Sequence, residues 1–185
     1  MDQHAESLPG FTLRHDLRPG DLGEVVRLHG TLYAQEYGFD STFEAYVAGP
    51  LAAFVLSRTD RDQIWLAECD GRLVGCAAIV PASETEAQLR WFLVDPSARG
   101  LGLGKRLLHE AVAFCRQAGY ATIILWTVSA LTAAARLYRA AGFEVVEEVP
   151  SRPWGVAVVE QKYALDLKRP HPASAPAPPT PPSFS

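Results

Sequence analysis

Three glycines within seven residues constrain this chain more than any other feature. Residues 99–105 read Arg-Gly-Leu-Gly-Leu-Gly-Lys, directly after an apolar strand pattern and a Pro-containing turn. Glycine lets the backbone come close to a ligand with its N–H groups turned outward. The pattern predicts a helix over 103–118, and a helix N-terminus offers unpaired N–H donors and a partial positive charge. The loop therefore predicts a site for a phosphate-bearing ligand.

The spacing of the glycines argues against the two commonest phosphate loops. A P-loop places four residues between its first glycine and Gly-Lys-Ser/Thr. Here only three residues separate Gly100 from Gly104, and Arg106 stands where the magnesium-binding hydroxyl belongs. A dinucleotide-binding loop reads G-x-G-x-x-G with an acidic residue about 20 positions later, and the predicted strand 122–127 holds none. ATP and NAD are therefore disfavoured.

Two ordered motifs resemble a known family. The first is Arg99-x-x-Gly102-x-Gly104, which follows the strand and turn at 92–96, and the second is Ala-x-x-Leu-Tyr-x-x-x-Gly-Phe at 134–143. Both resemble the GCN5-related N-acetyltransferases, the GNAT superfamily, over roughly residues 11–167. The resemblance implies the α/β GNAT acyl-CoA N-acyltransferase fold, with a mixed, mostly antiparallel central sheet flanked by helices.

The resemblance also implies acetyl-CoA as the acyl-donor co-substrate. Amides of the loop would hold its pyrophosphate, and the pantetheine would pair with the preceding strand. Leu131 stands where the family often has an asparagine that contacts the pantetheine, so a hydroxyl of Thr132 or Ser129 is a candidate replacement. The residues expected to bind acetyl-CoA are Phe92, Leu93, Val94, Arg99, Gly100, Leu101, Gly102, Leu103, Gly104, Lys105 and Thr132.

Acetyl transfer to an amine needs a proton for the departing thiolate and a group that takes the proton of the amine. Tyr138 matches the tyrosine that the family commonly sets beside the sulfur, although a tyrosine here also suits packing on the sheet. Glu36 is the candidate general base, because an aromatic-lined pocket raises the pKa of a carboxyl group. The other candidates for this base are His29, Glu84 and Glu86.

Four residues are candidates for binding the acceptor: His29, Tyr33, Arg90 and Trp126. Arg90 interrupts an apolar strand, where it either holds a substrate carboxylate or pairs with Glu84 or Glu86. Trp91 is expected on the opposite face of that strand because side chains alternate. Trp126 either lines the acceptor site or packs in the core.

These residues predict an enzyme that transfers an acetyl group directly to a primary amine of a small molecule or peptide. No cysteine is placed to form an acyl-enzyme. The alternative is a non-catalytic acyl-CoA-binding regulatory module, which Leu131 and the uncertain base leave open. Because one scaffold handles many amines, the sequence does not name the acceptor.

A closer resemblance rests on residues 28–40 and on Leu125–Val128. Both segments resemble the acetyltransferase half of proteins that fuse a MarR-type DNA-binding domain to a GNAT domain, and no winged-helix segment precedes them in this sequence. The net charge of −4 disfavours a nucleic-acid partner. A homodimer through the strands after Phe143 is an expectation from the resemblance.

Length and composition suit a GNAT domain over residues 1–168 and a disordered Pro/Ala-rich tail over 169–185. No apolar run reaches the roughly 18 residues of a membrane span, and the polar N-terminus does not resemble a signal peptide. The three cysteines lack metal-ligand spacing. We therefore expect a cytoplasmic protein with no metal and no membrane partner.

Hydrophobic periodicity and turn residues predict alternating helices and strands. Asp21 and Ser41 are the expected N-caps of the first two helices, and Gly49–Pro50 is expected to divide the second helical segment into two short helices. An Asp70–Gly71 turn predicts a hairpin. Helices are predicted at 21–37, 41–57, 103–118 and 131–141, and strands at 11–15, 63–69, 73–81, 87–94, 121–128, 143–149 and 156–167.

Overall fold

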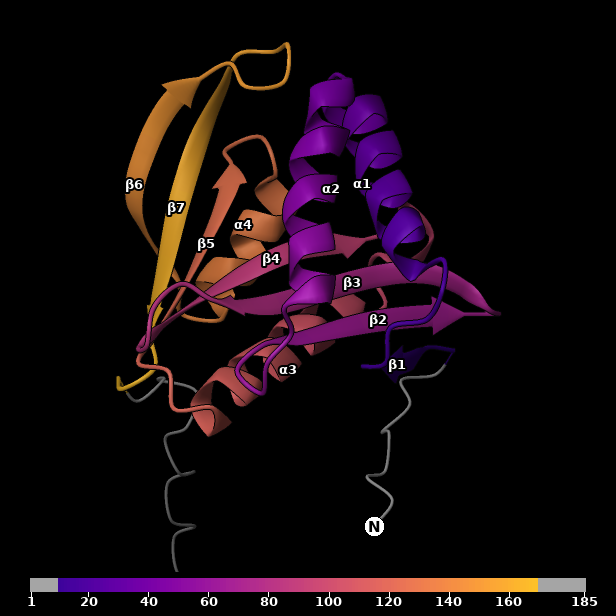
Figure 1. The fold of residues 1–185 in the computed structure, drawn as a ribbon. Helices are drawn as coiled ribbons and strands as arrows, with labels where there is room; N and C mark the ends of the chain where they lie inside the picture. The colour runs from indigo at the N-terminus through magenta and orange to yellow at the C-terminus, as the bar shows by residue number, and fades with distance from the viewer. Residues whose placement is uncertain (1–9, 170–185) are drawn as a thin grey trace, which may run out of the picture.

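The computed structural model describes residues 10–169, and these residues form one central sheet with helices on both faces (Figure 1). The predicted tail lies outside the described residues, except for its first residue. The strands are β1 (Thr12–Arg14), β2 (Gln63–Cys69), β3 (Arg72–Pro81), β4 (Glu86–Val94), β5 (Thr122–Val128), β6 (Glu144–Ser151) and β7 (Val158–Asp166). The helices are α1 (Asp21–Tyr37), α2 (Ser41–Leu56), the 3-10 turn η1 (Pro96–Ala98), α3 (Leu103–Gln117) and α4 (Thr132–Ala140).

The sheet has the order β1-β2-β3-β4-β5-β7-β6. Every neighbouring pair is antiparallel except β4 and β5, which are parallel. The predicted mixed, mostly antiparallel sheet is therefore confirmed. The hairpin at Asp70–Gly71 also forms as predicted, with Cys69 opposite Arg72.

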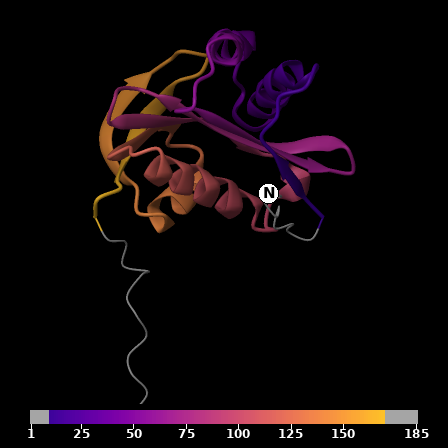
Figure 2. The same cartoon turned by 60° about the horizontal axis from the view of Figure 1, so that its bottom comes forward.

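Two helical layers cover the sheet, α1 and α2 on one face and α3 and α4 on the other (Figure 2). Each layer has its own hydrophobic core. Val25, Leu28 and Leu51 belong to the core under α1 and α2, and Leu107 and Ala111 to the core under α3. Both faces of the sheet are thus buried, as the apolar strands β3 and β5 require. No helix among residues 10–169 is long and apolar enough to cross a membrane.

The predicted break in the second helix is wrong, because α2 runs through Pro50 without interruption. Proline removes one intrahelical hydrogen bond. On both sides of Pro50 the helix buries large apolar side chains, with Val47 2%, Leu51 1% and Phe54 6% exposed. Burial of this kind contributes roughly 1.5–3 kcal/mol per side chain, which together exceeds the cost of the proline.

Both predicted N-caps are also wrong, each by one position. Gly20 precedes α1 with φ 101° and Asp21 is the first helical residue, whose carboxylate accepts a hydrogen bond from the Arg14 guanidinium. Asp40, instead of Ser41, caps α2 by accepting a hydrogen bond from the Thr42 amide at 2.9 Å. Asp and Ser cap helices about equally well, so the sequence alone does not decide between Asp40 and Ser41.

The sheet divides between β4 and β5. The two strands pair only at one end, where residues 86–88 of β4 lie opposite residues 122–124 of β5. Beyond that point they diverge (Figure 1), so the remaining length of β4 has no strand partner on that side. The division leaves strand-edge N–H and C=O groups at the middle of the molecule, where a ligand can pair with them.

A β-bulge lies in β4 at the start of the division. Trp91 has φ 47°, and the register with β3 shifts there, so that Trp91 and Phe92 together face Ala77. A bulge interrupts the alternation of side chains along a strand and redirects them. Positive φ in a bulky residue is rare and costs energy, so the surrounding structure must hold it in place.

Candidate active site

Two cavities meet at the divided part of the sheet. The larger, about 380 Å³, lies over the glycine loop and is called the loop cavity. The smaller, about 100 Å³, lies between α1, α2 and the strands and is called the aromatic cavity. Three residues line both cavities: Tyr33, Phe92 and Leu131.

The loop cavity brings most of the predicted acetyl-CoA-binding residues together. Leu101 and Thr132 do not line it: Leu101 is 58% exposed, and Thr132 begins α4 on the solvent side. The predicted residues that line it are Phe92, Leu93, Val94, Arg99, Gly100, Gly102, Leu103, Gly104 and Lys105.

The glycines have two separate roles at the N-terminus of α3. Gly102 takes the N-cap position with φ 83°, a left-handed conformation that suits glycine. Gly104 leaves space: a Cβ atom there would lie 3.3 Å from Leu137 Cδ2 and 3.6 Å from Val94 Cγ2. The absent side chain keeps the wall of the cavity open next to the unpaired N–H groups of the helix. These features fit a pyrophosphate-containing ligand.

Arg99 connects the loop to two other parts of the molecule. Its Nε donates to the carbonyl oxygen of Val94 at 3.1 Å, and its guanidinium donates to Glu36 of α1 at 2.8 Å. The bond to Val94 fixes the loop relative to the end of β4. The ion pair is partly exposed, with 48% of the Arg99 side chain accessible, so it contributes little energy by itself.

The structure places Glu36 on the loop cavity, away from the aromatic cavity in which a base was expected. The physical reason is its position at the end of α1, where its carboxylate meets the Arg99 guanidinium. Glu84 and Glu86, the other acidic candidates, line neither cavity. None of the three predicted carboxylates therefore faces the acceptor side.

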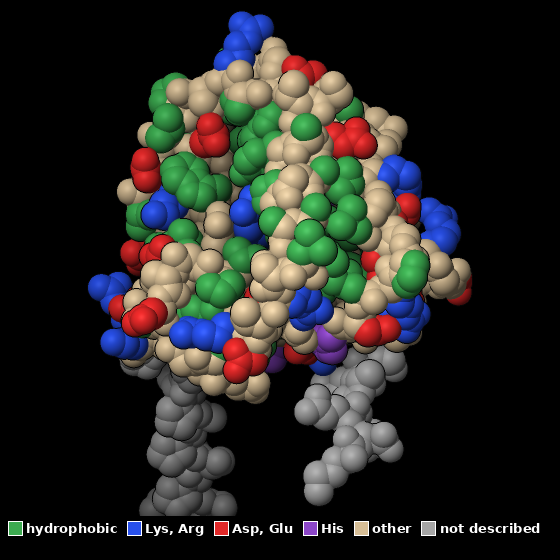
Figure 3. Space-filling view, in the orientation of Figure 1, with side chains coloured by type: hydrophobic (Ala, Val, Ile, Leu, Met, Phe, Trp, Pro, Cys, Tyr) green, Lys and Arg blue, Asp and Glu red, His purple; other side chains and the backbone are tan. Residues whose placement is uncertain are grey.

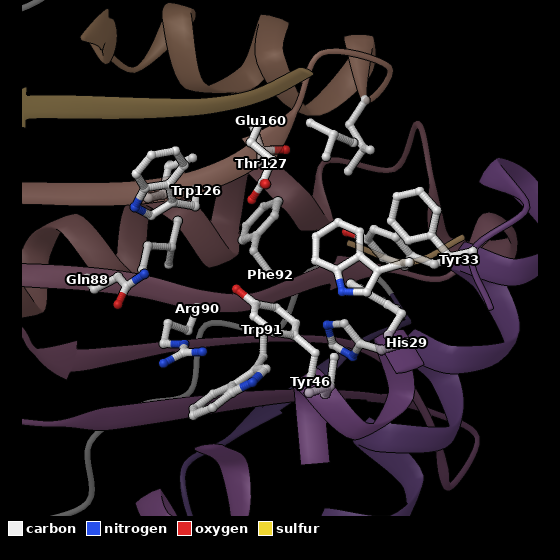
Figure 4. Close-up of a pocket in the computed structure, with 18 of the residues that line it drawn as sticks. His29, Tyr33, Tyr46, Gln88, Arg90, Trp91, Phe92, Trp126, Thr127 and Glu160 are labelled. Carbon is white, nitrogen blue, oxygen red and sulfur yellow. The ribbon is translucent and has the colours of Figure 1, made fainter. Parts of the chain in front are cut away.

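Aromatic side chains form most of the wall of the aromatic cavity (Figure 4). Tyr33 and Phe43 stack with ring centroids 4.4 Å apart, and Phe39 lies 4.8 Å from the Trp154 ring. In Figure 3 the surface is hollowed between α2 and the strands β5 and β7, and hydrophobic side chains border the hollow. Such a wall binds the apolar part of a ligand and leaves selection to its few polar groups.

Arg90 and Trp91 both line the aromatic cavity, although alternation along a strand predicts opposite faces. The bulge at Trp91 is the reason, since it breaks the alternation. The Arg90 guanidinium lies over the Trp91 ring at 5.2 Å, and among residues 10–169 no carboxylate pairs with it. The backbone oxygen of Glu84 accepts from Arg61 instead. The predicted pairing of Arg90 with Glu84 or Glu86 is therefore wrong.

His29 lies in the wall of the aromatic cavity and is 3% exposed. Its Nδ1 lies 2.8 Å from the carbonyl oxygen of Val25, and because a carbonyl only accepts, Nδ1 carries the proton. Burial lowers the pKa of His29 to about 4. The ring is therefore neutral at physiological pH, with its proton on Nδ1, and contributes no positive charge to the cavity.

Tyr138 lines the aromatic cavity, and its ring centroid lies 5.7 Å from that of Phe92, which lines both cavities. It is 4% exposed, and within the described part of the chain its hydroxyl has no hydrogen-bond partner. Burial raises the pKa of Tyr138 well above its ordinary value. The phenol therefore remains protonated and can donate.

Cys76 holds the bulge from the α1–α2 side of the sheet. Its thiol donates to the carbonyl oxygen of Trp91 at 3.0 Å, and burial raises its pKa to about 12, so the proton stays on sulfur. A trans peptide group is planar, with its N–H pointing opposite to its C=O. The N–H of Phe92 therefore points away from Cys76, and Phe92 is one of the three residues that line both cavities.

Sequence reasoning missed three polar residues of the aromatic cavity, namely Gln88 of β4, Thr127 of β5 and Glu160 of β7. Trp126 was predicted and lines the cavity, 37% exposed. Gln88 lies two positions before Arg90 in the same strand, so the period of two in a strand could have predicted that both side chains share a face. No sequence signal pointed to Glu160, because only the pairing of β5 with β7 places it opposite Val128.

A glycine loop at a helix N-terminus, a divided sheet and a second polar-aromatic cavity define a two-substrate enzyme that uses a nucleotide coenzyme. The model of the Acetyltransferase (GNAT) family matches residues 29–143. The chain therefore belongs to the GNAT acetyltransferase family, whose members take the acetyl group from acetyl-CoA.

Individual proteins agree with this assignment. An uncharacterized N-acetyltransferase of Schizosaccharomyces pombe is 32% identical over 138 residues, 73% of this chain and 83% of that protein. N-acetyltransferase family 8 member 2 of Rattus norvegicus is 34% identical over 110 residues, 55% of this chain, and the match spans about half (49%) of that relative's length. A Salmonella typhimurium acetyltransferase structure with acetyl-CoA has TM-score 0.67 at 18% identity, over 90% of this chain and 99% of that chain.

Proposed function

We propose that this GNAT acetyltransferase transfers the acetyl group directly to a primary amine of a small molecule or peptide. The observation that carries the proposal is the meeting of the two cavities at Phe92, whose ring contacts the Tyr138 ring. Acetyl-CoA in the loop cavity would present its thioester at this point. The aromatic cavity leads to the same point from the other side, as an acceptor site must.

Backbone groups and two side chains would carry the chemistry. Acetyl-CoA supplies the thioester, whose carbonyl carbon bonds to the amine nitrogen while the carbon–sulfur bond breaks. The Phe92 N–H would donate to the thioester oxygen as negative charge develops there. The Tyr138 hydroxyl would give its proton to the departing sulfur, and the Glu160 carboxylate would take the proton that the amine loses.

Substitution of Tyr138 by phenylalanine tests the proposal. Tyr138→Phe keeps the ring contacts and removes the proton donor, so we expect kcat to fall about 100-fold with the Kd for acetyl-CoA unchanged. Thiol release across an amine panel measures kcat, and calorimetry measures Kd. Tyr163→Phe is the matched control: its hydroxyl is also buried, but it donates to Gln161 on β7, and kcat should stay the same.

An absence of thiol release with every amine, despite tight binding of acetyl-CoA, would instead favour the non-catalytic regulatory module. No observation on residues 10–169 favours that alternative: Tyr138 and a carboxylate both line the aromatic cavity. Unchanged kcat in Tyr138→Phe would remove the proposed role of the phenol and leave the enzyme assignment intact.

Three further parts of the proposal concern the setting of the enzyme. We propose a cytoplasmic location, and a homodimer through β6, an edge strand that exposes Val145, Val146 and Val149 by 37%, 57% and 39%. An exposed apolar edge strand is a common site of association. The likeness to the acetyltransferase half of MarR–GNAT fusion proteins stays a prediction.

A further inference from the structure

Arg90 lies in the wall of the aromatic cavity, and no carboxylate of residues 10–169 forms an ion pair with it. Arg90 is a half-buried residue of β4, and its guanidinium lies over the face of the Trp91 ring. A cation–π contact holds the guanidinium in position but leaves its N–H donors unused. A half-buried guanidinium loses hydration, and without a partner that loss is uncompensated. A ligand with an anionic group would compensate it.

The two charged side chains of the aromatic cavity lie in different parts of its wall. Gln88 and Arg90 lie on one side of the cavity in Figure 4, His29 and Tyr33 on the other, and Thr127 and Glu160 beyond Phe92. His29 is neutral, so Arg90 is the one positive charge among the residues of this wall, and Glu160 is the one negative charge. The two charges come from different strands, β4 and β7.

We propose that the acceptor is a small amine that also carries a carboxylate, as amino acids do, with Arg90 holding the carboxylate. This inference rests on the proposed function. The guanidinium fork matches a carboxylate with two parallel hydrogen bonds, whereas Glu160 suits the ammonium group of the same molecule. The aromatic wall binds the apolar part, and a volume of about 100 Å³ favours a small acceptor.

Matched acids and amides test the carboxylate directly. Phenylalanine and phenylalaninamide, and leucine and leucinamide, differ only in that group. The wild-type kcat/KM for each acid should exceed that for its amide by about 10- to 100-fold, the worth of a charged bidentate contact. The amino group of phenylalaninamide or leucinamide is less basic than that of the free amino acid, so a larger fraction of it is unprotonated at neutral pH. A faster reaction of the acid therefore cannot come from a larger supply of unprotonated amine.

Arg90→Gln should abolish the preference by lowering kcat/KM for the acids to the level of the amides. Arg90→Lys should keep part of it, since an ammonium group attracts a carboxylate without bidentate geometry. The control Arg27→Gln removes an exposed arginine of α1 that contacts Glu24, and should leave the preference as it is. Equal rates for acids and amides in the wild type, or an equal loss for both in Arg90→Gln, would overturn the inference.

A binding experiment keeps this result separate from the proposed function. 3-Phenylpropionate has the carboxylate but no amine, so it should stabilise the CoA-loaded protein against heat, whereas 3-phenylpropanamide should not. Arg90→Gln should remove the stabilisation. If no amine releases thiol but the acid binds through Arg90, the carboxylate site stands and the proposed function falls. If 3-phenylpropionate does not stabilise the wild-type protein, the inference that Arg90 binds a carboxylate is wrong.

Discussion

The loop cavity and the aromatic cavity are built in different ways. The loop cavity takes most of its lining residues from one stretch of chain, residues 92–105, and the others from α1, Leu131 and α4. The aromatic cavity takes its residues from six elements, α1, α2, α4, β4, β5 and β7, and from the loops that hold Phe39, Leu131 and Trp154. A site made of contiguous backbone depends on glycine and on a helix end, whereas a site made of distant side chains depends on packing.

The largest effect should come from filling the loop cavity. Gly104→Glu adds a side chain 3.3 Å from Leu137 and a negative charge where phosphates would bind. We expect the Kd for acetyl-CoA, measured by calorimetry, to rise more than about 100-fold, roughly 2.7 kcal/mol. The control Gly49→Glu meets open space in α2 and should bind normally. Normal binding by a folded Gly104→Glu would contradict the backbone-built site.

A smaller effect is expected at the junction of the two cavities. Cys76→Ala removes the donor to the Trp91 carbonyl and loosens the bulge, so kcat should fall about 3- to 10-fold, with the Kd for acetyl-CoA unchanged. Cys76→Ser restores a donor and should restore most of kcat.

The matched control for this junction is Cys115→Ala. Cys115 is just as buried, but it packs in the core under α3, so the substitution should lower the melting temperature without lowering kcat. Equal loss of kcat in Cys76→Ala and Cys76→Ser would mean that packing, and not the hydrogen bond, positions the bulge.

The smallest effect is expected at Glu36. Glu36→Gln breaks a partly exposed ion pair with Arg99, worth under about 1 kcal/mol, so kcat should change by less than about threefold. Glu160→Gln, in the aromatic cavity, should lower kcat by more than about tenfold. A pH–rate profile of both variants measures the difference. Loss of the acidic limb, where the rate rises as a base deprotonates, in Glu36→Gln alone would return Glu36 to the role of general base.

Local signals predicted most of the secondary structure and failed where tertiary contacts intervened. The helix at 21–37 and the hairpin at Asp70–Gly71 follow from periodicity and turn chemistry. Pro50 was predicted to break α2, and the burial of Val47 and Leu51 overrode it. A propensity is a small local energy, and several buried side chains outweigh it.

The same limit applies to the candidate site. Tyr138 and the glycine loop could be named as candidates because each belongs to a short contiguous motif, and their roles stay predictions. Glu36 was expected beside the acceptor and lies beside Arg99 instead. The sequence places Glu36 at the end of a helix but does not show which cavity that end of the helix lines. Arg90 and Trp91 were assigned to opposite faces, and the bulge brings both into one cavity. The sequence carries no local sign of that bulge.

The sequence by itself determined the cofactor half of this protein. The spacing of Gly100, Gly102 and Gly104 before a helix predicts a phosphate site, because a contiguous backbone segment presents its N–H groups wherever it folds. Only the tertiary structure decided the acceptor half. Arg90 and Glu160 lie 70 positions apart in the numbering and line one cavity because β5 pairs with β7 while parting from β4. Which side chains share a cavity is a property of strand order and packing, which local sequence does not encode.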